Sequence, residues 1–248
     1  LSDQCYRFEN VSFSYEKGIE VLHDINFEVK PNSVFAIVGE SGSGKSTIAK
    51  LMAGFFDAND GRIYFGDQDV KSIPTSQLMK HVAYVAQDNF LFDTSIRENL
   101  KIAKADATDE EIQAALKAAN CLELIERLPE GLNSNAGDCG KFLSGGERQR
   151  ITLARAMLAD AQCIILDEAT AYADVENEAK IQEALSRLMK DKTLIVVAHR
   201  LNTIVGADQI MVLGHGKIES IGTHKELIQN SSAYQKLWQS YSGKEVVE

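Results

Sequence analysis

Apolar residues in the first third of the chain stand in short alternating or continuous runs, a pattern typical of β-strands. Gly, Pro, Asn and Asp separate these runs and favour turns between them. The pattern predicts strands over residues 6–13, 25–29, 34–38, 62–65 and 82–86.

The middle of the chain changes to helical spacing. Thr108 and Glu111 form the capping-box pattern of a helix start, and the Ala- and Leu-rich stretch behind them continues to residue 128 before Pro129 and Gly131. A second helix is predicted to begin near Ser144 and to continue to Leu158. We therefore expect a helical insert between two β-rich parts.

Two continuous apolar runs, residues 163–166 and 194–198, bracket a helix predicted over 175–189. Strands that are buried on both faces of a parallel sheet have this composition, so the fold class is predicted to be α/β. We expect a single domain over residues 1–248, with 1–87 and 160–248 as its core and about 88–159 as a helical subdomain.

Composition narrows the possible partners. The chain has 248 residues, 44% of them hydrophobic, which is enough for a sizeable core. Its net charge of -10 argues against nucleic acid as a partner bound through bulk electrostatics. The cysteines, Cys5, Cys121, Cys139 and Cys163, form no C-x-x-C pair, so neither a zinc ribbon nor a disulfide framework is predicted.

The sequence lacks any apolar run of about 18 residues that could span a membrane, and it lacks the pattern of a signal peptide. It begins at Leu1 rather than Met. We expect a domain that has been excised from a longer protein.

Residues 39–46 match the phosphate-binding pattern G-x-x-x-x-G-K-[ST] between a predicted strand and a predicted helix. Glycines let successive backbone N–H groups face phosphates, Lys45 reaches the β- and γ-phosphates, and the Ser46 hydroxyl can ligate Mg²⁺. A chance Gly/Ser loop is the alternative, which the flanking elements disfavour. The predicted nucleotide-binding residues here are Gly39, Glu40, Ser41, Gly42, Ser43, Gly44, Lys45, Ser46 and Thr47.

Two adjacent acids follow the predicted strand 163–166. Asp167 can hold the Mg²⁺ shell, and Glu168 can polarise an attacking water. An ordinary helix N-cap would explain this segment if it stood alone. Together with the phosphate loop, the two acids predict nucleotide hydrolysis.

Residues 143–150, Leu-Ser-Gly-Gly-Glu-Arg-Gln-Arg, resemble the signature motif of ABC ATPases. A helix start approached by small residues is a good anion site. The resemblance implies that Ser144, Gly145, Gly146 and Glu147 contact the γ-phosphate of the ATP held by an opposing subunit. Many family members have Gln where this chain has Glu147.

The remaining landmarks of the family follow in order. Tyr15 resembles the aromatic residue that stacks on adenine, and Gln87 resembles the glutamine that touches Mg²⁺ or water. His199 resembles the switch histidine that contacts the γ-phosphate and orients the water. Each of the three could be a structural or surface residue if it stood alone, so their assignment depends on the resemblance.

Residues 92–100 resemble exporters within this family, at a place where the helical insert would meet a membrane domain. Two segments depart from the usual exporter pattern. Ala171 replaces the usual serine of the D-loop while Asp174 is kept, and Asp138 replaces the usual glutamate before the signature. The variant around Ala171 resembles a bacterial half-transporter subgroup linked to siderophores or metal chelates.

The resemblance implies a P-loop NTPase core with a mixed or parallel sheet, an N-terminal antiparallel β subdomain and a helical subdomain that carries the signature. It further implies ATP and Mg²⁺ as cofactors, with Ser46, Gln87 and Asp167 toward the metal. The expected catalytic residues are Glu168, His199, Gln87 and Lys45.

The resemblance also implies partners. These are a second nucleotide-binding domain, identical or different, in a head-to-tail dimer, and transmembrane domains at the cytoplasmic side of the cell membrane. An importer ATPase is the nearest alternative. A DNA-repair or chromosome ATPase would carry coiled coils or zinc ligands between the phosphate loop and the signature, and this chain shows neither pattern there. A regulatory binding module would lack Glu168 or His199.

Overall fold

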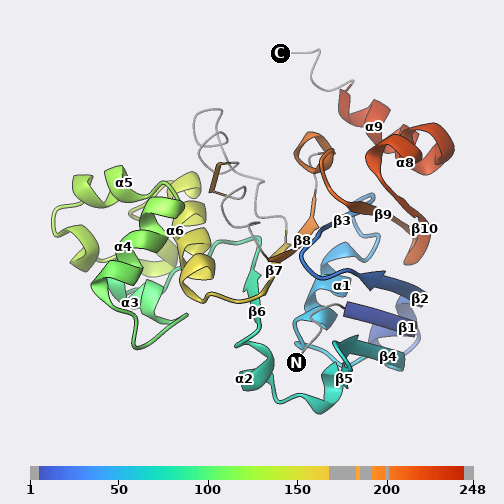
Figure 1. Ribbon diagram of the computed structural model, residues 1–248, viewed down its shortest axis with the longest axis horizontal. Coiled ribbons are helices and arrows are strands. Elements are labelled where there is room, and N and C mark those ends of the chain that lie inside the picture. The colour runs from blue at the N-terminus through green and yellow to red at the C-terminus, as the bar shows by residue number, and fades with distance from the viewer. Residues whose placement is uncertain (1–5, 168–182, 185–191, 199–200, 243–248) are drawn as a thin grey trace.

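The computed structural model describes residues 6–167, 183–184, 192–198 and 201–242. In these residues two β-sheets and a group of helices lie in a row (Figure 1). The first sheet is antiparallel, with the strand order β2-β1-β4-β5. Its strands are β1 (Tyr6–Glu16), β2 (Ile19–Val29), β4 (Asp60–Phe65) and β5 (Gln68–Asp69).

The second sheet has the order β10-β9-β3-β8-β7-β6. Its strands are β3 (Val34–Val38), β6 (Val82–Val85), β7 (Cys163–Asp167), β8 (Thr193–Val197), β9 (Gln209–Gly214) and β10 (Lys217–Gly222). All neighbouring pairs are parallel except β9 with β10. The sheet is therefore mixed, as predicted.

Helices cover both faces of this second sheet, and that is why its strands read as continuous apolar runs. In β7, Ile164 and Leu166 pack into the cluster that contains α6 (Gly145–Leu158), whereas Cys163 and Ile165 pack into the cluster that contains α1 (Lys45–Met52). The α1 cluster also includes Phe8 of β1, so it joins the two sheets.

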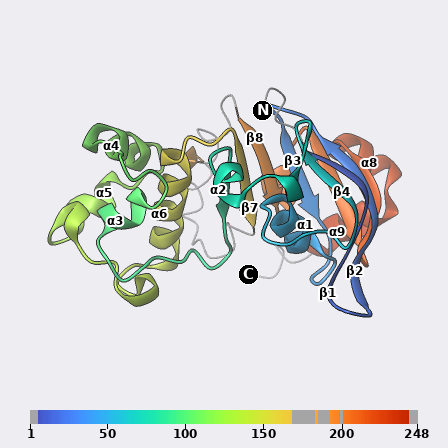
Figure 2. The ribbon, with the colours of Figure 1, turned by 90° about the horizontal axis from the view of Figure 1, so that it is seen from below.

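The helical group comprises α3 (Ile96–Lys101), α4 (Asp109–Ala118), α5 (Leu122–Arg127) and α6. Figure 2 shows α4 and α5 at the opposite end of the molecule from β1 and β2. The short elements are α2 (Thr75–Leu78) and the 3₁₀ turns η1 (Val70–Ser72), η2 (Gly131–Asn133), η3 (Asp138–Gly140) and η4 (Leu201–Ile204). At the C-terminus, α8 (His224–Asn230) and α9 (Ser232–Ser242) pack beside β9 and β10.

The α/β fold class is confirmed, with the antiparallel sheet and the helical part in the expected order. The prediction of one helix from Thr108 to residue 128 is wrong in one respect, because this stretch forms two helices, α4 and α5. Asn120 has a φ of 54° between them, a left-handed conformation that ends α4. The helix predicted over 175–189 lies outside the described residues. No described helix is both long and apolar enough to cross a membrane.

Candidate functional site

The carboxyl ends of four parallel strands meet at one edge of the mixed sheet. Ile37 of β3 and Asp167 of β7 both pair with Val197 of β8. On the other side of β7, Leu166 pairs with Val85 of β6. Ligands of open α/β sheets bind in the crevice outside this edge. The loop 39–44 and Gln87 follow strands that end here, and Asp167 is the last residue of β7.

The loop after β3 is built around glycines that other residues cannot replace. A Cβ on Gly39 would lie 2.0 Å from the backbone oxygen of Leu213, and one on Gly44 would lie 2.6 Å from a methyl group of Leu22. Gly44 also has a φ of 104°, which side chains rarely allow. The loop is therefore held close against β9 and β2.

The N-terminus of α1 is open to an anion. Its N-cap is Gly44, which supplies no side-chain hydrogen bond, whereas Ser95, Thr108, Ser144 and Thr223 cap α3, α4, α6 and α8 with their hydroxyls. The first N–H groups of a helix lack partners within it and attract negative charge. They border a cavity of about 210 Å³ lined by Val21, Ser41, Gly42, Gly44, Lys45, Ser46 and Thr47.

Lys45 brings its ammonium to this loop. The residue is 4% exposed, and its Nζ donates to the backbone oxygens of Gly39 and Glu40, both at 2.9 Å. A phosphate is a stronger acceptor for an ammonium than a neutral carbonyl. Glycine conformation, an uncapped helix start and a nearby lysine together fit a polyphosphate.

Ser46 and Asp167 lie side by side although they come from different elements. The Ser46 Oγ donates to Asp167 Oδ1 at 2.8 Å, and Asp167 is 4% exposed at the end of β7. A hydroxyl and a carboxylate this close are oxygen ligands of the kind that Mg²⁺ takes alongside phosphates. The residues present therefore fit the metal that the sequence implies.

Tyr84 of β6 was not predicted as a site residue. Its hydroxyl donates to Asp167 Oδ2 at 2.6 Å. Burial and the hydrogen bond to Asp167 raise the pKa of Tyr84 well above its ordinary value, so the phenol stays neutral and remains a donor. The signal that could have found it is strand register: Tyr84 pairs with Ile165, two residues before Asp167.

Tyr15 lies near the end of β1 with 48% of its surface exposed. Its hydroxyl lies 3.1 Å from Thr47 Oγ1, and its ring makes edge contacts with Phe13 and Phe56 at 4.8 and 5.2 Å between centroids. These contacts fix the ring next to α1. An exposed and fixed aromatic ring suits stacking on a base.

The signature residues lie at the start of α6. The Ser144 Oγ accepts from the Glu147 N–H at 3.3 Å, and the Glu147 carboxylate accepts from the Ser144 N–H at 2.8 Å and from the Arg127 guanidinium. Burial alone would raise the pKa of Glu147, but the Ser144 and Arg127 hydrogen bonds lower it overall. None of residues 144–147 lines the cavity beside α1.

The remaining predicted site residues are Gln87, Glu168, Asp174 and His199. Gln87 is exposed just after β6, and its backbone oxygen accepts from the Asn89 side chain at 3.2 Å. Glu168, Asp174 and His199 lie outside the described residues, so their predicted roles stay predictions.

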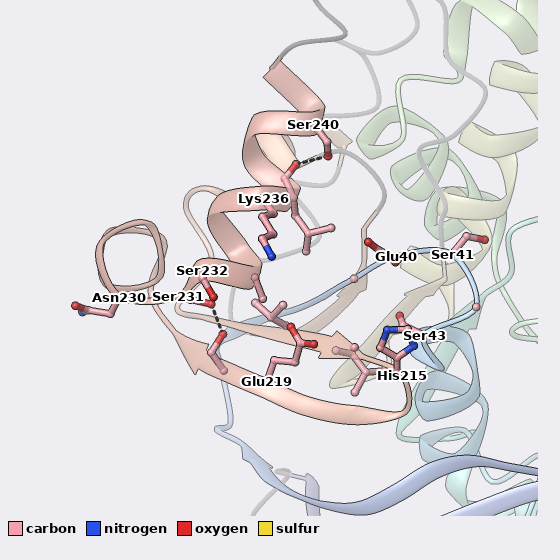
Figure 3. A pocket seen from close by; sticks show the side chains of 18 residues that line it. Glu40, Ser41, Ser43, His215, Glu219, Asn230, Ser231, Ser232, Lys236 and Ser240 are labelled. Carbon is pink, nitrogen blue, oxygen red and sulfur yellow. Dashed lines mark hydrogen bonds between the residues drawn. The ribbon is translucent and has the colours of Figure 1, made fainter.

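A larger cavity of about 880 Å³ lies on the other side of the phosphate loop. Figure 3 shows it between Glu40 and Ser41 of the loop and the side chains of Glu219 on β10 and Lys236 on α9. Lys45 and Ser46 line the smaller cavity and not this one, and Asp167 lines neither. The smaller cavity is therefore the one that holds the residues predicted to contact the phosphates and Mg²⁺.

An apolar surface, which we define as the neighbouring rings of Phe90 and Phe92, lies just before α3, and Phe142 before α6 is a further exposed ring. The side chains are 41%, 50% and 66% exposed, and the rings of Phe90 and Phe92 meet edge to face at 4.9 Å. Behind Phe92, the buried Asn99 of α3 holds the loop, because its side chain bonds the Phe92 N–H and C=O at 2.8 and 3.0 Å. Exposed aromatic clusters mark interaction surfaces.

Comparison with known proteins is consistent with this site. A family model described as ABC transporter matches residues 22–171. The heavy metal tolerance protein of Schizosaccharomyces pombe is 48% identical over 232 residues, which cover 93% of this chain and 28% of that protein. The mycobactin import ATP-binding/permease protein IrtA of Mycolicibacterium smegmatis is 46% identical over 233 residues, 94% of this chain and 27% of that protein.

The structure of a bacterial Atm1-family ABC exporter with ATP bound matches with a TM-score of 0.92 and 35% identity, covering 100% of this chain and 43% of that chain. The chain thus spans less than a third of the length of the two relatives and less than half of that exporter chain.

Proposed function

The chain belongs to the ABC transporter family, as an ATPase domain of the exporter type, and we propose that it is the motor of a membrane transporter that works as an ATP-dependent dimer. The observation that carries the proposal is the Ser46–Asp167 pair beside the open start of α1. We further propose one domain over residues 1–248, with about 88–159 as its helical subdomain.

Each residue of the site has a proposed role in Mg²⁺-dependent hydrolysis. The N–H groups of the loop and the Lys45 ammonium bind the phosphates, and the Tyr15 ring stacks on adenine. Ser46, Asp167 and Gln87 would hold Mg²⁺, which would supply positive charge to neutralise the phosphates. Glu168 takes a proton from the attacking water, while His199 and Gln87 orient that water.

We propose that each ATP is shared between two subunits. Ser144, Gly145, Gly146 and Glu147 would contact the nucleotide of the opposing subunit together with the loop that contains Asp174. This is supported by the position of residues 144–147, which do not line the cavity of their own chain. ATP then stabilises the dimer, and hydrolysis weakens it because the contact with the terminal phosphate is lost.

The second proposed partner is a pair of transmembrane domains, which would place the chain at the cytoplasmic side of the membrane. The apolar surface of Phe90 and Phe92 supports this because two exposed aromatic rings in contact suit a helix end from a partner. The hydrogen bonds of Asn99 keep that surface in one shape.

For the complete transporter we propose cargo of the metal-chelate class. Support comes from the names of two relatives, one a heavy metal tolerance protein and the other a mycobactin import protein. Because the second name assigns import to that relative, transport into the cell is the second candidate direction beside export.

The test is ATP hydrolysis by the chain with and without Mg²⁺. We expect Lys45→Ala, Asp167→Asn and Glu168→Gln each to lower the rate by at least about 100-fold, since each removes a group from the transition state. Lys80→Ala is the matched control because Lys80 is exposed and precedes β6, at the opposite end of that strand from Gln87. A Glu168→Gln chain that retains the full rate would overturn the proposed mechanism.

A further inference from the structure

Both oxygens of the Asp167 carboxylate are held by hydroxyl donors. The Ser46 Oγ bonds Oδ1 at 2.8 Å, and the Tyr84 hydroxyl bonds Oδ2 at 2.6 Å. The donors come from different elements, Ser46 from α1 and Tyr84 from β6. The carboxylate is nearly excluded from solvent, with 4% of the residue exposed.

The Tyr84 ring is itself fixed. Its backbone pairs with Ile165 in the parallel register of β6 and β7, so its hydroxyl can reach the end of β7. The ring of Phe55 meets it edge to face, with centroids 5.0 Å apart and planes at 68°. Phe55 in turn follows α1, and its backbone N–H donates to the backbone oxygen of Lys50 in that helix at 3.0 Å. Tyr84 is thus connected to both elements that carry the metal residues.

The two donors differ in their relation to a bound metal ion. The Ser46 hydroxyl would contact the metal itself, because its oxygen can give a lone pair to Mg²⁺ while its proton stays directed at Asp167 Oδ1. Tyr84 is bonded to the other oxygen and can keep its bond throughout. Donors of this kind, behind a metal ligand, fix its orientation and contribute to metal affinity.

We infer that Tyr84 is a positioning residue for Asp167, whose hydroxyl holds the carboxylate in the orientation that binds Mg²⁺ with nucleotide. The inference rests on the proposed function. It concerns the metal step, because the Tyr84 hydroxyl is bonded to Asp167 and Tyr84 is not among the residues that line the cavity beside α1.

The test is equilibrium binding of a non-hydrolysable ATP analogue to the chain, measured by calorimetry in EDTA and over a series of Mg²⁺ concentrations. Tyr84→Phe removes only the hydroxyl. We expect unchanged affinity in EDTA and an apparent Mg²⁺ affinity about 10-fold weaker or more, as for other residues behind a metal ligand. Phe55→Leu keeps the hydroxyl but loosens the ring, so a smaller shift in the same direction is expected.

Tyr64→Phe is the matched control. It makes the same chemical change on β4, where the ring contacts Arg7 at 4.6 Å instead of Asp167, and we expect no change in Mg²⁺ dependence. Equal loss of affinity in EDTA and in Mg²⁺ for Tyr84→Phe would overturn the inference, since a general structural role predicts that result. So would an unaltered Mg²⁺ dependence. An unsubstituted chain that binds no analogue would overturn the proposed function, and the inference with it.

Discussion

Replacing Asn99 with Ala should destabilise the chain strongly although residue 99 is not in the nucleotide site. Asn99 is fully buried. Its Oδ1 accepts from the Phe92 N–H at 2.8 Å and from Arg155 at 3.1 Å, and its Nδ2 donates to the oxygens of Phe92 and Ser95 at 3.0 and 3.1 Å. Alanine removes these four hydrogen bonds and a longer one from Nδ2 to the Thr94 oxygen at 3.5 Å.

The magnitude follows from these contacts. A typical hydrogen bond contributes about 1 kcal/mol net, and a buried group left without a partner costs somewhat more. Phe92 is half exposed, so water can replace part of the loss there. We expect the free energy of unfolding to fall by about 2–4 kcal/mol. The Phe92 amide should also lose its protection from hydrogen exchange.

Urea unfolding monitored by circular dichroism measures the first effect, and hydrogen exchange measures the second. Asn133→Ala is the matched control in the same helical group, because Asn133 is exposed and accepts only a 3.4 Å bond from Arg97. We expect it to cost less than about 0.5 kcal/mol. Similar losses for the two variants would refute the role given to Asn99 in holding the loop.

Three further predictions concern other parts of the chain. Arg127→Ala leaves the Glu147 carboxylate without its guanidinium partner at the proposed anion site, so ATP-dependent dimerisation should weaken about 2- to 5-fold. Adding Glu147→Gln removes the unpaired charge and should restore dimerisation. Sedimentation over an ATP titration measures this, and a double variant that shows no recovery would contradict it. Iodoacetamide at neutral pH should label Cys139 in a Cys5→Ser background but not Cys121 or Cys163. The pKa of all three thiols is raised, that of Cys121 to about 12, but Cys139 is exposed to the reagent whereas Cys121 and Cys163 are buried; peptide mass spectrometry detects either outcome. Hydrogen bonds from the Thr223 N–H and hydroxyl lower the pKa of Glu226 below its ordinary 4.5. The ionised Glu226 therefore stabilises the fold above pH 4.5, and this stabilisation is lost as the pH falls through the lowered pKa. The unfolding free energy of Glu226→Gln, measured against pH, should lack this loss.

Local signals in the sequence predicted much of the fold because they depend on neighbouring residues. The capping box of Thr108 with Glu111 is present as expected, and Ser144 with Glu147 forms another. The glycine-rich loop likewise needs only its own residues and the strand and helix beside it. The family resemblance then supplied the order of the remaining motifs.

Three features were missed, and only the first depends on long-range pairing. The bond from Tyr84 to Asp167 joins residues 83 positions apart and requires the register of β6 against β7. The break at Asn120 depends on one residue in a left-handed conformation, which helical spacing does not reveal. The hairpin of β9 and β10 was also not predicted, although its turn at His215 and Gly216 carries two positive φ angles suited to such a connection.

The central claim, that ATP joins two copies through shared sites, is tested most directly by sedimentation of the Glu168→Gln chain with and without Mg²⁺-ATP. Lys45→Ala serves as the nucleotide-free control. The account predicts a dimer with Mg²⁺-ATP for Glu168→Gln, a monomer without it, and a monomer under both conditions for Lys45→Ala. A Glu168→Gln chain that binds ATP and still sediments as a monomer would contradict the claim.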